Sequence, residues 1–72
     1  MITLKAHYGT AIETAIGKAK ATGKRETVNA TDGAEVYAYP HARGIAWGVT
    51  DQTGMNVLRG IRRPDGTDEA MR

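Results

Sequence analysis

The segment from Ala34 to Thr50, with the sequence AEVYAYPHARGIAWGVT, constrains the fold more than any other part of the chain. It contains two of the three tyrosines, the only tryptophan, and β-branched or aromatic residues at alternate positions. Such alternation is typical of strands whose two faces differ in burial. Pro40 lacks a backbone donor, and the stretch His41–Gly44 favours a loop. The segment predicts a β-hairpin at the centre of a small sheet, with strands at Ala34–Tyr39 and Ile45–Thr50.

The residues before this hairpin predict a strand followed by a helix. Ile2 to Tyr8 alternate between apolar and polar side chains, which favours a half-buried strand. Thr10 and Glu13 have the spacing of a capping box, and Gly23 is a natural C-cap, so a helix is expected between them. Its apolar positions share one face: Ala11, Ile12, Ala15, Ile16 and Ala19.

Three further segments complete the expected organisation. Short strands are predicted at Glu26–Thr31 and at Met55–Ile61, and turns at Asp32–Gly33 and at Asp51–Gly54. Pro64 to Arg72 contain few apolar residues, which predicts a flexible tail. We therefore expect an α+β domain over residues 1–63 in the order β-α-β-β-β-β. One helix would cover one face of an antiparallel sheet of four to five strands.

Size and composition limit the possible functions. A chain of 72 residues forms one domain and buries only about 60% of its unfolded surface, which leaves little room for a deep cleft. The absence of cysteine excludes disulfides and thiolate zinc sites. The N-terminus does not have the pattern of a signal peptide, and no apolar run approaches the roughly 20 residues that span a bilayer. We expect a cytoplasmic protein.

The charges are unevenly distributed. Residues 1–63 carry nine Lys or Arg and five Asp or Glu, a net charge of +4, whereas residues 64–72 carry a net charge of −2. The basic side chains form two clusters in sequence: Lys18, Lys20, Lys24 and Arg25, and then Arg59, Arg62 and Arg63. Either cluster could contact phosphates, although lysines also favour helix C-termini and strand-edge charges also discourage aggregation.

No catalytic, metal or cofactor motif is present in the sequence. His7 and His41 have no acid or second histidine at the spacing of a metal site. The glycines form neither of the common phosphate-binding patterns. We therefore expect no enzymatic activity, no cofactor and no bound metal.

The parity of the strands predicts an uncovered sheet face. If Ile45, Trp47 and Val49 face the helix, the residues between them face the other way. The same parity places further residues on that face: Lys5, His7, Thr27, Asn29, Tyr37, Tyr39, Ala46 and Gly48. Two tyrosines among small and basic residues form a platform for a protein surface or for bases. The simpler alternative is that these tyrosines only cover a thin sheet.

Two resemblances bear on function. Residues 43–49, RGIAWGV, resemble the RNA-recognition-motif signature, but Ile45 replaces its first aromatic residue and Gly48 replaces a valine, so no residue role is transferred. In general character the chain resembles small accessory proteins of phages and mobile elements, including inhibitors of host defence complexes such as CRISPR effectors. That resemblance implies binding to a protein rather than catalysis.

We expect a non-catalytic module, of the inhibitor or adaptor type, that occupies the surface of a protein partner. The alternative is a mildly basic nucleic-acid-binding domain that uses the tyrosines and the Lys and Arg clusters. The expected partner-binding residues are Lys24, Arg25, Tyr37, Tyr39, Arg43, Arg59, Arg62 and Arg63. A homodimer formed through an edge strand is a further expectation, because an exposed edge can pair with a second copy.

Overall fold

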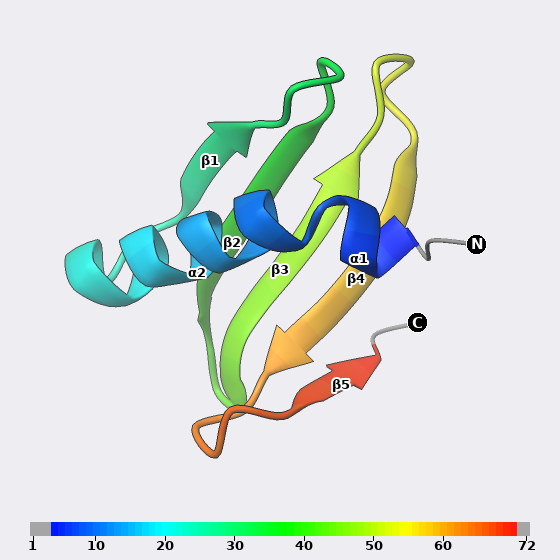
Figure 1. Ribbon diagram of the computed structural model, residues 1–72. Helices are drawn as coiled ribbons and strands as arrows, with labels where there is room; N and C mark the ends of the chain where they lie inside the picture. The colour runs from blue at the N-terminus through cyan, green and yellow to red at the C-terminus, as the bar shows by residue number, and fades with distance from the viewer. Residues whose placement is uncertain (1–3, 71–72) are drawn as a thin grey trace.

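The computed structural model describes residues 4–70 of the chain. Two helices, α1 (Leu4–His7) and α2 (Gly9–Thr22), precede the strands. The strands are β1 (Glu26–Asn29), β2 (Glu35–His41), β3 (Gly44–Thr50), β4 (Asn56–Arg62) and β5 (Asp68–Ala70). Each strand pairs antiparallel with its sequence neighbours, in the order β1-β2-β3-β4-β5. Helix α2 lies across one face of this sheet (Figure 1), which confirms the predicted α+β architecture.

Three of the strand connections share one loop geometry. In each, the backbone N–H of the residue before a three-residue loop donates to the carbonyl oxygen of the residue after it: Ala30 to Ala34, Asp51 to Met55, and Arg63 to Thr67. The third loop residue is Gly33, Gly54 or Gly66, with φ of 90°, 88° and 91°. This left-handed position is the reason that these loops require glycine. The turns predicted at Asp32–Gly33 and Asp51–Gly54 are therefore confirmed.

The β2–β3 connection is a two-residue turn, in which His41 pairs with Gly44. The prediction that Pro40 ends its strand is wrong, because Pro40 lies within β2 opposite Ile45. Its neighbour His41 pairs with β3, so the nitrogen of Pro40 faces the other side of β2. Pairing with β1 stops at Ala38. The missing donor therefore breaks no bond between described strands.

The strand predicted at Ile2–Tyr8 is wrong. Residues 4–7 form α1, and residues 2–3 lie outside the described part of the chain. A short alternation is a weak signal when Ala, Leu and Lys supply much of it, because all three have high helix propensity. Tyr8 follows α1 and packs into the core, while Lys5 forms an ion pair with Asp68 of β5 at 2.5 Å. Residues 4–8 thus lie against the sheet without joining it.

Helix α2 begins before the predicted cap and has no capping box. Tyr8 is the N-cap residue and makes no side-chain capping bond. Glu13 does not bond back to the helix start but instead accepts hydrogen bonds from Arg62 of β4. The C-terminal prediction is confirmed, since Gly23 is left-handed with φ of 70° and its N–H donates to Ala19 at 2.8 Å.

The expectation of a flexible tail from Pro64 to Arg72 is wrong for residues 68–70, which form β5. This strand pairs with β4 through its backbone. Its Asp68 also contacts Lys5 and Arg62. Polar contacts rather than apolar burial therefore hold it, while residues 71–72 lie outside the described range.

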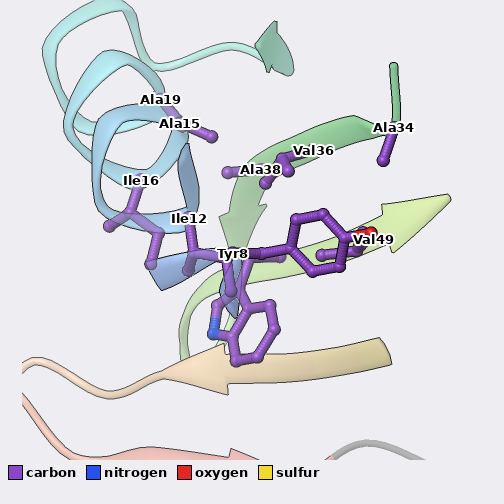
Figure 2. Packing of buried hydrophobic residues seen from close by; sticks show 10 residues of the cluster. Tyr8, Ile12, Ala15, Ile16, Ala19, Ala34, Val36, Ala38 and Val49 are labelled. Atoms are coloured by element: carbon purple, nitrogen blue, oxygen red, sulfur yellow. The ribbon is translucent and has the colours of Figure 1, made fainter. Parts of the chain in front are cut away.

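The core lies between α2 and the sheet (Figure 2). Its buried residues are Tyr8, Ile12, Ala15, Ile16, Ala19, Ala34, Val36, Ala38, Trp47 and Val49. Trp47 is the largest of them and lies against Gly60 of β4, where an added Cβ would come within 2.6 Å of the indole Cζ2. Gly60 therefore leaves the space that the indole ring occupies.

Candidate binding face

The strand register defines the face of the sheet that α2 does not cover. Val36, Ala38, Trp47 and Val49 pack with α2, so the residues between them point to the opposite side. We call this side the open face, formed by Tyr37, Tyr39, Ala46, Gly48, Arg59 and Ile61. Ala46 and Ile61 are themselves fully buried, so the exposed part of this face is formed by the larger polar and aromatic side chains. No element among residues 4–70 lies over it (Figure 1). Lys5 and His7, which parity placed here, instead lie in α1.

Tyr37 and Tyr39 are adjacent on the open face. Their ring centroids are 6.3 Å apart and the ring planes differ by 10°. Tyr37 lies opposite Gly48, and a Cβ at that position would overlap its ring. The Asn56 amide donates to the Tyr37 hydroxyl and to the Val49 carbonyl, each at 3.1 Å. These contacts fix the Tyr37 ring against the sheet.

Arg25 joins the tyrosines from the segment before β1. Its guanidinium carbon lies 4.7 Å from the centre of the Tyr37 ring, within cation–π range. Arg25, Tyr37, Tyr39, Thr50 and Asn56 line a shallow hollow of about 610 Å³. The structure therefore brings three of the predicted partner-binding residues into one surface.

Arg59 contributes a second cation to the open face. It lies opposite Gly48 in the β3–β4 pairing and is exposed. Neither Arg59 nor Arg25 forms an ion pair with a carboxylate within the described residues. Both charges are therefore accessible to a partner.

Arg43 and Arg63 lie at one end of the open face, where they share a carboxylate. Glu69 of β5 lies opposite Ile61 and therefore shares its side of the sheet. It contacts Arg43 at 2.5 Å and Arg63 at 3.2 Å. Both arginines are exposed, so these ion pairs contribute little stability, but they partly neutralise two of the predicted partner-binding cations.

Arg62 lies on the side of the sheet that faces α2. Its side chain is only 17% exposed and connects Asp68 of β5, at 2.5 Å, with Glu13 of α2. The hydrogen bonds from Arg62 lower the pKa of Glu13. Burial alone would raise the pKa of Asp68, but Arg62 and Lys5 reverse this effect, and the net shift is downward. Arg62 thus connects three elements and is not part of the open face.

Lys24 is exposed in the connection between α2 and β1, where its backbone N–H donates to the Thr22 hydroxyl at 3.2 Å.

The two histidines contact different partners. His7 is 3.5 Å from Asp32, and His41 Nδ1 accepts from the Arg43 N–H at 3.1 Å. Within residues 4–70, no group of three or more His, Cys, Asp or Glu could hold a metal ion.

Two residues important to this surface were not predicted from the sequence. Asn56 fixes Tyr37, and Glu69 contacts Arg43 and Arg63. Both contacts depend on strand register. The turn length between β3 and β4 indicates only the pairing of Thr50 with Asn56, because a bulge between Val49 and Thr50 shifts the rest of the register. For Glu69 the sequence offers no apolar pattern to indicate a strand.

No described helix is long and apolar enough to cross a membrane. Comparison of the chain with protein-family models, with curated proteins and with solved structures finds no match.

Proposed function

We propose that this protein is a non-catalytic binding module that occupies the surface of a protein partner with its open face. The observation that carries the proposal is the arrangement of Arg25, Tyr37 and Tyr39 on a sheet face that no described element covers. Tyrosine and arginine are among the residue types that most often dominate binding energy at protein interfaces. An inhibitor or an adaptor of this size acts by such occupation.

The chemistry of this surface favours a partner patch that combines an apolar or aromatic centre with carboxylates. The Tyr37 ring provides apolar area that is already ordered, because the sheet and Asn56 restrict it. Ordered side chains lose less conformational entropy on binding. Arg25 and Arg59 supply positive charge beside the rings, which complements acidic side chains.

The experiment compares partner capture by the wild-type protein with capture by the double variant Arg25→Ala/Tyr39→Ala. Neither side chain belongs to the core, so the variant should fold. Lys20→Ala on α2 is the matched control, because it removes a cation away from the sheet. A partner captured by wild type and control should bind the double variant at least about 30-fold more weakly, as for a loss of about 2 kcal/mol. Equal affinity for all three proteins would contradict the proposal.

Single-stranded nucleic acid is the second candidate, and the near-parallel Tyr37 and Tyr39 rings favour it, because bases stack on such rings. Arg43, Arg62 and Arg63 already contact carboxylates, which leaves fewer cations for phosphates and supports the protein partner. Fluorescence anisotropy of labelled oligonucleotides at about 50 and 200 mM salt separates the two candidates. Tight binding that collapses at the higher salt would support nucleic acid.

A further inference from the structure

Strand β1 has an unpaired outer edge. It ends the sheet, and the Ala30 N–H donates to the Ala34 carbonyl at 2.8 Å across the β1–β2 hairpin. Because alternate residues of an antiparallel strand bond to opposite sides, Val28 directs its backbone groups to β2. Thr27 and Asn29 therefore direct theirs outward. No strand within residues 4–70 pairs with these groups, which fit the edge of another extended strand.

A groove accompanies this edge on the helix side. It has a volume of about 420 Å³ and lies between the start of α2 and β1. Its apolar floor is Ala11, Val28 and Ala30, all only partly buried, and its polar rim includes His7, Thr10, Thr14 and Thr31. A strand added to β1 would place alternate side chains beside this floor.

The charges around β1 are self-complementary. Lys24 and Arg25 precede the strand, and Asp32 follows it. If two copies of β1 run antiparallel with Val28 opposite Val28, the segment with Lys24 and Arg25 of each copy lies beside the turn that contains Asp32 of the other. The charges at the two ends of β1 therefore favour a second, antiparallel copy as the occupant of the edge.

We propose that β1 pairs with β1 of a second copy, antiparallel and with Val28 at the two-fold axis. Thr27 of each copy exchanges backbone hydrogen bonds with Asn29 of the other. The axis is perpendicular to the sheet, so the two five-stranded sheets join into one. Both α2 helices lie on one side of it, and both open faces lie on the other. The dimer thus presents two copies of the open face on one surface.

The first test measures mass in solution as a function of concentration. Wild-type mass by light scattering should rise from 7.7 kDa towards twice that value. Thr27→Pro removes an outward N–H, leaves the bonds between β1 and β2 in place, and should remain at 7.7 kDa. Thr27→Val keeps the N–H and should dimerise. Circular dichroism checks that each variant is folded. If the wild-type protein stays monomeric at millimolar concentration, the proposal is overturned. This holds even if β1 is then found to bind a foreign peptide.

The second test uses the absence of cysteine from the chain. Residues opposite each other in a non-hydrogen-bonded antiparallel pair have Cα atoms about 4.5 Å apart, a distance that a disulfide can span. Val28→Cys should therefore oxidise to a covalent dimer much faster than Thr53→Cys, a control in an exposed turn. Equal oxidation rates, in a protein that dimerises, would place the interface elsewhere and overturn the proposed register.

Discussion

The ring of Tyr37 lies directly against Gly48, where any larger residue would overlap its hydroxyl and Cζ. The two residues are opposite each other in the β2–β3 pairing. Because Gly48 has no side chain, Tyr37 can lie across β3 and accept the hydrogen bond from Asn56. The position of one tyrosine on the open face therefore depends on one glycine of the neighbouring strand.

Gly48→Ala should displace Tyr37 without unfolding the protein. The overlapping atoms form the free end of a side chain that can rotate away, so we expect a loss of about 1 kcal/mol or less in unfolding free energy. The Tyr37–Asn56 bond should be lost, which NMR shifts of both side chains would report. Partner affinity should fall by about as much as we expect for Tyr37→Ala, a variant that lacks the ring. An unchanged Tyr37 ring environment would contradict the prediction.

Gly60→Ala should be more destabilising, because Trp47 is buried and cannot move aside. The added Cβ would lie 2.6 Å from the indole Cζ2, and overpacking of this kind costs about 1–3 kcal/mol. Gly17→Ala is the matched control, because an added Cβ there meets nothing within 4 Å. It should stabilise α2 by about 0.5–1 kcal/mol. Urea denaturation measures both, and equal effects would show that Trp47 is not confined.

Arg62→Ala should destabilise the fold. The substitution removes the hydrogen bonds to Glu13 and to Asp68, and charge-assisted bonds of this kind contribute about 1.5–3 kcal/mol. Arg59→Ala removes the same charge from an exposed site without an ion pair, so its effect should stay within about 0.5 kcal/mol. Thermal unfolding of the two variants compares them. A smaller effect for Arg62→Ala than for Arg59→Ala would refute the structural role.

The contact between Tyr8 and Asp32 should contribute to stability only within a pH window. The Tyr8 hydroxyl donates to Asp32 at 2.6 Å. This bond, helped by the Ala34 N–H, lowers the pKa of Asp32 below its ordinary 3.8. The same bond, followed by burial, raises the pKa of Tyr8 above its ordinary 10.0. The contribution of this bond to the unfolding free energy is therefore fully present between pH 3.8 and pH 10.0, the ordinary pKa values of the two groups.

The contribution of the Tyr8–Asp32 bond to stability should weaken as the pH falls through the pKa of Asp32 in the folded protein. It should also weaken as the pH rises through the pKa of Tyr8 in the folded protein. The measurement is the difference in unfolding free energy between wild type and Tyr8→Phe. It should be larger at neutral pH than at a pH where Asp32 is protonated. Tyr39→Phe is the control, since that hydroxyl has no hydrogen bond to Asp32. A difference that does not depend on pH would contradict the assignment.

The sequence predicted those features that depend on local chemistry. The turn glycines, the C-cap at Gly23 and the buried face of α2 are determined by backbone conformation and helical periodicity. The parity of Trp47 and Val49 also placed Tyr37 and Tyr39 on the uncovered side. These predictions hold because each depends on a few neighbouring residues.

Features held by distant polar contacts were missed. Strand β5 has the sequence Asp-Glu-Ala and forms because β4 offers its backbone and because Lys5, Arg43 and Arg62 contact its carboxylates. A search for hydrophobic periodicity does not detect such a strand. Glu13 matched a local capping motif, but Arg62, distant in sequence, competes successfully for its carboxylate. Local patterns do not show which distant partner will be close.

The sheet is a meander, in which the order of strands in space equals their order along the chain. Each hairpin can therefore close over a short loop before the next one forms, and chains with such local contacts fold fast for their size. The ion pair between Lys5 and Asp68 also brings the two ends of the described chain together. Joining the ends with a linker and opening the Ala42–Arg43 turn would give a circular permutant whose β2 and β3 are no longer neighbours in sequence. The decrease in folding rate of this permutant would measure how much the wild-type connectivity accelerates folding.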